Sequence, residues 1–128
     1  MSRIIKFRVW DKHDNKWRDL LSDAVYSTYE QLERPERFVV NQFTGFIDKS
    51  GREIYEGDLV NFTIPGITHG PEREELTNME VHWDQEEGCW AFGRCKNGWG
   101  EVFSYSVGDR IDTETFEVVG NIMEKAAL

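Results

Sequence analysis

The amino-acid sequence predicts a mostly-β fold, a small antiparallel barrel or sandwich with one short helix. Bulky side chains alternate with polar ones in several short runs, and turns rich in Gly, Asn and Asp separate these runs. Aromatic residues make up 13% of the 128 residues, which is enough apolar surface to fill one core. The length fits a single domain spanning residues 1–128.

The first predicted elements are a strand over residues 4–10, a polar turn over 11–16, and a return strand that begins at Trp17. Residues 24–29 fit two structures. Val25, Ser27 and Tyr29 could line one face of a strand, but Ser27 followed by Glu30 also matches a capping box at a helix start. We favour a short helix from about Thr28 that ends before Pro35, because the residue before proline avoids helical angles.

The middle of the chain predicts a strand over 38–43, turns at 44–45, 48–51 and 56–58, and a strand over 59–64. Phe46 and Ile47, between the first two turns, are both expected on the core. Residues 65–78 contain two prolines, two glycines and clustered charge, so they are expected to form a flexible loop. Residues 79–84 alternate and predict the next strand.

A hairpin is expected over residues 90–105. Asn97-Gly98 suits a two-residue turn with positive φ at both positions, and this turn sets a register. In that register Lys96 faces Trp99, Arg94 faces Glu101, Phe92 faces Phe103, and Trp90 faces Tyr105. The last predicted strand covers 116–123, and residues 124–128 are expected to be a frayed tail. The order of these strands is similar to SH3-like barrels, so the fold is expected to be partly SH3-like.

The net charge of −9 disfavours nucleic-acid binding, because an acidic surface repels the phosphate backbone. No run of Lys and Arg offers a basic patch. The chain has no long apolar run and no signal peptide, which predicts a cytoplasmic protein without a membrane contact.

The sequence predicts no catalytic residues, no metal site and no cofactor. Cys89 and Cys95 would lie on one strand, roughly 20 Å apart, too far to share a metal or form a disulfide unless Gly93 breaks the strand. His82 alternates outward on its own strand. No nucleophile elbow and no phosphate-binding loop is present.

A possible binding loop lies in the turn-rich segment over residues 42–58. Its polar residues either build consecutive turns, which is the favoured interpretation, or form a rigid binding surface. The candidate binding residues are Thr44, Asp48, Lys49, Arg52, Glu53, Glu56 and Asp58.

The same segment carries a family resemblance. Residues 42–60 read QFTGFIDKSGREIYEGDLV, and they resemble the characteristic segment of the YopX family of phage and prophage proteins. Residues 5–11 (IKFRVWD), 81–84 (VHWD) and 116–124 (FEVVGNIME) are similar to other parts of that family. The resemblance implies a mostly-β fold and a role in the cytoplasm of a bacterial host. It supplies no activity and no catalytic residues, since none are defined for the family.

The favoured hypothesis is a non-enzymatic accessory protein that binds a protein partner, including itself, with exposed strand edges as the mechanism. One alternative is an acidic DNA mimic that uses the carboxylates between Glu72 and Glu87 to inhibit a nucleic-acid-binding protein. Another is an enzyme acting on small nucleotides or sugars. Such an enzyme would need a pocket in which polar groups converge, for example His82 beside a carboxylate.

Overall fold

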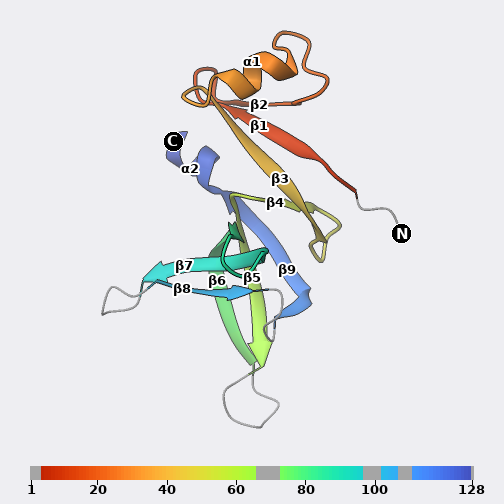
Figure 1. Cartoon of the computed structure of the whole chain (residues 1–128). Coiled ribbons are helices and arrows are strands. Elements are labelled where there is room, and N and C mark those ends of the chain that lie inside the picture. The colour runs from red at the N-terminus through yellow and green to blue at the C-terminus, as the bar shows by residue number, and fades with distance from the viewer. Residues whose placement is uncertain (1–3, 66–72, 97–101, 107–110, 128) are drawn as a thin grey trace.

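The computed structural model describes residues 4–65, 73–96, 102–106 and 111–127. The chain forms two antiparallel sheets, one of four strands and one of five, together with two short helices (Figure 1). The mostly-β antiparallel fold predicted from the sequence is therefore confirmed. A second helix is present where only one was expected.

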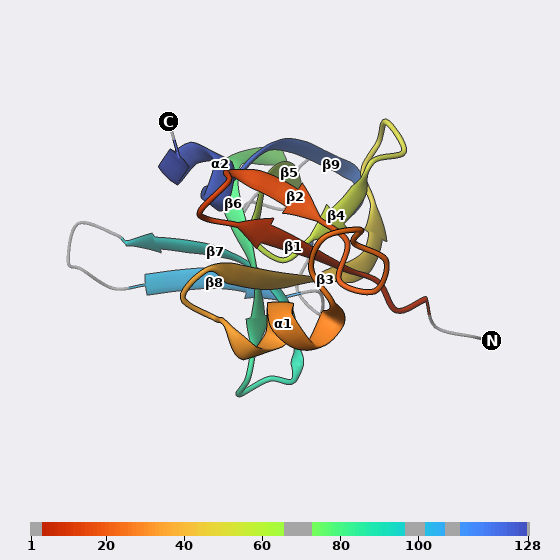
Figure 2. The same cartoon turned by 90° about the horizontal axis from the view of Figure 1, so that it is seen from above.

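The four-stranded sheet has the order β2-β1-β3-β4. Its strands are β1 (Phe7–Asp11), β2 (Lys16–Arg18), β3 (Phe38–Ile47) and β4 (Glu53–Tyr55). Helix α1 (Thr28–Glu33) connects β2 to β3 and lies beside β3 when the molecule is seen from above (Figure 2). The Ser27 hydroxyl accepts a hydrogen bond from the Glu30 amide, which confirms the predicted helix start.

The five-stranded sheet has the order β8-β7-β6-β5-β9 and curls into a half-barrel. Its strands are β5 (Asp58–Pro65), β6 (Arg73–Asp84), β7 (Cys89–Lys96), β8 (Val102–Ser106) and β9 (Asp112–Asn121). Helix α2 (Ile122–Ala127) follows β9 directly. Residues 124–127 are thus helical rather than a frayed tail. The Asn121 side chain accepts a hydrogen bond from the Met123 amide at the start of this helix.

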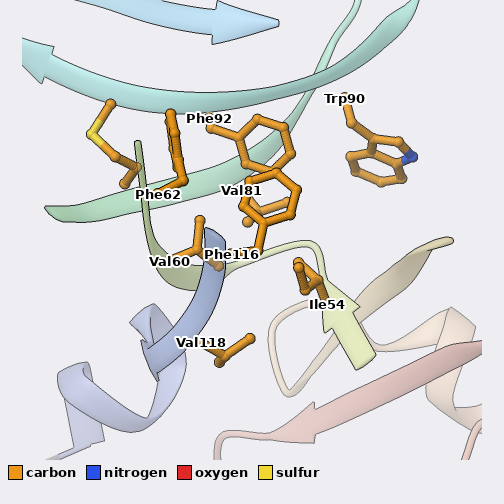
Figure 3. Close-up of a cluster of buried hydrophobic side chains, with 9 residues drawn as sticks. Ile54, Val60, Phe62, Val81, Trp90, Phe92, Phe116 and Val118 are labelled. Carbon is orange, nitrogen blue, oxygen red and sulfur yellow. The ribbon is translucent and has the colours of Figure 1, made fainter. Parts of the chain in front are cut away.

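The main core fills the concave face of the half-barrel. Phe62, Phe92 and Phe116 meet there with ring centroids 5.0–5.7 Å apart. Figure 3 shows these rings close to Val81, with Ile54 reaching toward them from β4 of the other sheet. Ile54 is fully buried, so the four-stranded sheet contributes to the core of the half-barrel. A smaller cluster of Val9, Leu20 and Phe38 lies under α1.

Ile47 is not on the core as the sequence analysis expected. Phe46 packs against the main cluster, with its ring 6.0 Å from that of Phe116. Ile47 follows it in the same extended strand and is 56% exposed. Successive side chains in a strand point to opposite faces, so Ile47 points away from the main cluster that Phe46 contacts. The turn expected at residues 44–45 is instead a register shift within β3, where Gly45 has φ 91°.

The predicted flexible loop over residues 65–78 is shorter than expected, because residues 73–78 belong to β6. The strand begins before residue 79 because Leu76 packs against the main core, opposite Phe62 on β5. Residues 66–72, the rest of that loop, lie outside the described part of the chain.

The predicted hairpin register is wrong. Phe92 pairs with Tyr105 rather than Phe103, so Trp90 does not pair with Tyr105. Past Gly93 the register shifts again, so that Lys96 pairs with Val102. Gly93 has φ 141°, which a side chain would disfavour, and it allows the bulge. Residues 97–101, including Asn97-Gly98, lie outside the described residues.

Candidate functional site

Asp48, one of the predicted binding residues, is buried in the turn between β3 and β4. One carboxylate oxygen accepts hydrogen bonds from the Ser50 amide, the Ser50 hydroxyl and the Arg52 amide. The other accepts one from the Val118 amide of β9, at 3.0 Å. This side chain therefore shapes its own turn and ties it to the half-barrel.

The environment of Asp48 stabilises its charged form. Burial alone would raise the pKa of this carboxyl, but the Val118, Arg52 and Ser50 hydrogen bonds outweigh burial and lower the pKa to about 2. A carboxylate that is buried, ionised and fully hydrogen-bonded within the protein has little capacity left for a ligand. Asp48 is thus a structural residue.

Asp58 holds the two sheets together at the start of β5. Its Oδ1 accepts hydrogen bonds from Arg8 on β1, at 2.6 Å, and from Asn121 at the end of β9, at 3.1 Å. Its Oδ2 accepts one from the Tyr55 amide, at 2.8 Å. The carboxylate is only 1% exposed. Three elements that are distant in the sequence therefore meet at one side chain.

Two aromatic rings hold the Arg8 guanidinium in addition to its ion pair with Asp58. Its guanidinium carbon lies 4.1 Å from the ring centroid of Trp17 and 4.6 Å from that of Tyr55. Cation–π contacts of this kind add to the ion pair with Asp58. The Trp17 indole in turn donates a hydrogen bond to Glu124, which attaches α2 to β2.

Most of the other predicted binding residues also contact other residues of the chain. The Thr44 hydroxyl donates to the Ile54 carbonyl, Lys49 pairs with Glu117, and Glu53 pairs with Lys6. Glu56 accepts a 3.4 Å hydrogen bond from the Gln42 amide. Arg52 has an exposed side chain. The geometry of segment 42–58 thus supports the turn-building interpretation that the sequence favoured.

A second buried charge network joins β1, β2 and the residues that flank α1, and the sequence analysis did not find it. Asp11 is fully buried and accepts hydrogen bonds from both Arg18 and Arg37. The two guanidinium groups lie 4.7 and 4.6 Å from the ring centroid of Tyr26. Burial would raise the pKa of Asp11, but the bonds from Arg37 and Arg18 hold it well below its ordinary value.

Exposed apolar side chains concentrate near α1. Among the described residues nine large hydrophobic side chains are exposed, and four of them fall within residues 21–32. These four are Leu21 (77% exposed), Val25 (67%), Tyr29 (70%) and Leu32 (56%). We call them the 21–32 surface.

The loop that carries Leu21 and Val25 is folded onto α1. The buried Gln31 side-chain amide donates to the backbone carbonyls of Leu20 and Tyr26, and the Thr28 hydroxyl also donates to the Leu20 carbonyl. Tyr29 and Leu32 are three residues apart on α1 and share one face of the helix. The 21–32 surface is therefore held by fixed hydrogen bonds and is not a loose tail.

A crevice lies between β3, the β4–β5 turn, β6 and α2. It has a volume of about 200 Å³, and His82, Glu80, Glu56 and Asn41 line it together with apolar residues. The Oδ1 atom of Asn41 is buried and has no hydrogen-bond partner within the described residues. His82 does lie near carboxylates here, but ligand pockets are commonly larger, roughly 300–1,000 Å³. A second hollow of about 410 Å³ lies beside Val119 and Glu124.

The acidic row required by a DNA mimic is only partly described. Along β6, Met79 and Val81 are buried, so Glu80, His82 and Asp84 point to the opposite face. Glu80 and Asp84 are four residues apart on this strand, roughly 13 Å. The side chains of residues 72–74 lie outside the described part of the chain.

The cysteine and histidine side chains that the structure describes form no common site. Cys89 and Cys95 both lie on β7, as expected, and Cys89 is a free thiol. The side chain of Cys95 is outside the described residues. His13 is in the β1–β2 turn beside Asp14. Among the described residues no three His, Cys, Asp or Glu side chains form a metal-binding group.

Three comparisons with known proteins bear on this chain. A family model described as YopX protein matches residues 18–128. A crystal structure of protein EF1440 from Enterococcus faecalis is similar over 98% of this chain and 97% of that chain, with a TM-score of 0.55 and 21% sequence identity. At this identity the likeness concerns the fold alone. No curated protein matches the chain.

None of the described helices is long and apolar enough to cross a lipid bilayer.

Proposed function

The chain belongs to the YopX family, and we propose that it is a non-enzymatic module that binds a protein partner through the 21–32 surface. The concentration of Leu21, Val25, Tyr29 and Leu32 carries this proposal. Grouped exposed apolar side chains on a soluble domain are typical of protein interaction sites. Tyrosine is among the residues that contribute most at such sites. The family resemblance supports an accessory role for a phage or prophage, in the cytoplasm of a bacterial host.

Three of the four strand edges, those of β2, β4 and β9, give little support to binding by strand addition. In the four-stranded sheet the edge strands β2 and β4 have three residues each. The edge of β9 is occupied by the β3–β4 turn, because the Lys49 amide donates to the Phe116 carbonyl and the Val118 amide donates to Asp48. Short or covered edges are a common defence against strand pairing. The 21–32 surface is the better candidate for docking.

Two further features favour binding over catalysis. The residues that the sequence singled out in segment 42–58 are engaged in holding turns and sheets. The crevice that brings His82 near Glu80 and Glu56 is small, at about 200 Å³. An enzyme acting on nucleotides or sugars needs room for the substrate and for the groups that react with it.

Affinity capture from the native bacterial cell, read by quantitative mass spectrometry, tests the proposal. The variants to compare are the natural chain, Leu32→Ser and Ile47→Ser. Leu32 and Ile47 are both 56% exposed, so the two changes are matched in exposure. We expect Leu32→Ser to lose a partner protein at least tenfold and Ile47→Ser to retain it. Equal capture by all three chains would contradict the proposal.

A further inference from the structure

We infer that the occupant of the 21–32 surface is a positively charged amphipathic segment of a different protein, and not a second copy of this chain. This inference rests on the proposed function and adds the chemistry of the partner. It follows from where the carboxylates lie around the four exposed apolar side chains, from how the nearby arginines are used, and from the symmetry that self-association would impose.

Two of the apolar residues sit directly beside a carboxylate. The Asp19 carboxylate accepts hydrogen bonds from the Leu21 and Ser22 amides, at 3.0 and 3.2 Å. The Asp23 carboxylate accepts one from the Val25 amide, at 2.9 Å. These bonds fix both carboxylates, because each is needed to hold its own turn. The Asp23 side chain is 11% exposed and also pairs with Arg18, so the exposed Asp19 supplies the negative charge, beside Leu21.

The helical half of the surface has the same arrangement. Glu33 is exposed and follows Tyr29 by four positions on α1, so the two side chains are neighbours on the helix surface. Glu36 is exposed a few residues further on. Residues 19–36 contain five carboxylates and one arginine, a net charge of −4 within a chain of −9.

The two arginines that flank residues 19–36 in the sequence are already engaged in ion pairs. Arg18 is buried, with a side chain 4% exposed, and it pairs with Asp11, Asp14 and Asp23. Arg37 pairs with Asp11 and Asp14. Arg34 is the only basic residue within 19–36, so carboxylates dominate the rim of the surface.

Self-association through this surface would place like charges together. In a symmetric dimer each patch faces its own copy, so the rim of one chain that carries Asp19, Glu33 and Glu36 would meet the equally acidic rim of the other. Like charges brought together at an interface oppose binding. A segment that carries apolar side chains flanked by Lys or Arg would instead match both the apolar centre and the acidic rim.

Three synthetic peptides of about 18 residues, long enough to form a helix in water, provide the probes. The first has Leu on one helical face and Lys on the other. The second has Glu in place of Lys, and the third keeps Lys but has Ser in place of Leu. Binding is measured by calorimetry and mapped by ¹H–¹⁵N NMR shifts on the full chain. Light scattering over a range of protein concentrations gives the molar mass of the chain in solution and so shows whether it forms a dimer.

We expect the Leu/Lys peptide to bind with NMR shifts centred on residues 19–36. Its affinity should fall at least tenfold with Leu32→Ser and stay unchanged with Ile47→Ser. The Leu/Glu and Ser/Lys peptides should bind at least tenfold more weakly. Circular dichroism and melting curves of both variants check that each is folded.

Three results would overturn the inference. Equal binding of the Ser/Lys peptide would mean that charge alone acts, and equal binding of the Leu/Glu peptide would mean that the acidic rim selects nothing. A dimer that Leu32→Ser abolishes would make a second copy the occupant. The last two outcomes leave the proposed protein-binding function standing. Loss of that function would instead be seen as equal capture of cellular partners by all variants.

Discussion

Asp48 and Asp58 are buried carboxylates that each join elements distant in the sequence. Asp48 and Asp58 were candidates for a binding loop, yet each is buried and accepts hydrogen bonds from residues of distant elements. Asp48 connects the β3–β4 turn to β9, and Asp58 connects β1, β4 and β9. Their replacement should therefore affect stability first.

Asp48→Asn should destabilise the chain by about 2–3 kcal/mol, since leaving a buried hydrogen-bond donor unpaired costs about 1–3 kcal/mol. The amide can no longer accept from both the Val118 and the Arg52 amides. Urea denaturation measures the change. Asp84→Asn is the control. The Asp84 carboxylate also accepts a hydrogen bond within a turn, from the Glu86 amide, but that turn is exposed. A loss at Asp48 no larger than at Asp84 would contradict this assignment.

The pH dependence of the unfolding free energy should also reflect Asp48. The pKa of Asp48 in the folded chain is about 2, below its ordinary value of 3.8. Its contribution is therefore complete above about pH 4 and is lost as the pH falls toward 2. The shift corresponds to about 2 kcal/mol. Unfolding free energies measured from pH 5 to pH 2 should fall less steeply in Asp48→Asn than in the natural chain, and parallel curves would count against the account.

Arg8→Lys should weaken the joint between the sheets although the charge is kept. Lysine cannot lie flat between the Trp17 and Tyr55 rings as the guanidinium does. We expect a loss of about 1–2 kcal/mol in unfolding free energy, together with a change in tryptophan fluorescence. Lys6→Arg, at an exposed ion pair with Glu53, is the control and should change stability little. Equal effects at the two positions would show that the stacking contributes nothing.

The sequence indicated which polar residues were unusual but not what they contact. Asp48 and Asp58 stood out because they lie in a dense series of turns. Their partners Val118, Arg8 and Asn121 are 50 to 70 residues away in the chain. The network of Asp11, Arg18 and Arg37 had no local signal at all, because charged residues beside a turn are ordinary until the fold buries them.

At the scale of elements, the sequence predicted the structure well where the deciding contacts join residues that are close in the chain. The start of α1 was predicted because Ser27 and Glu30 form a capping interaction within one turn. The β7–β8 register was not, because it depends on a bulge at Gly93 that shifts the strands past each other. α2 was missed because Ile122 and Met123 were assigned to the last strand and only five residues follow them, whereas the Trp17–Glu124 hydrogen bond holds the helix from another sheet.

Gly57 should be required for its backbone conformation rather than for space. It has φ 87° in the β4–β5 turn, donates to the Val81 carbonyl, and accepts from the Ile122 amide. A Cβ there would meet Asn41, Asn121 and Ile122 at 3.5–3.6 Å, which is ordinary contact. Gly57→Ala should therefore cost about 1–2 kcal/mol, the usual penalty for a side chain at positive φ.

Gly51→Ala is the matched comparison, because Gly51 has φ 89° and nothing within 4 Å of its added Cβ. Chemical denaturation of the two variants should give losses within about 0.5 kcal/mol of each other, a difference typical of independent surface sites. A much larger loss at Gly57 would mean that crowding at the junction of the sheets, and not backbone strain, makes glycine necessary.

At the scale of the whole molecule, the two sheets share one core and are joined by the Arg8–Asp58 and Asp48–Val118 contacts. Within the described part of the chain, four of the nine exposed large apolar side chains belong to the 21–32 surface. Sequence patterns did not find it. Leu21 and Leu32 had no pattern that singled them out, and Val25 and Tyr29 fitted one face of a strand as well as the start of a helix; the fold exposes all four.

Hydrogen–deuterium exchange of the chain, free and bound to the partner recovered by affinity capture, tests the central claim most directly. The account predicts slower exchange on binding in residues 19–36 and unchanged exchange in residues 42–58. Slower exchange centred on residues 42–58, with 19–36 unchanged, would contradict it and return the binding site to the turn-rich segment.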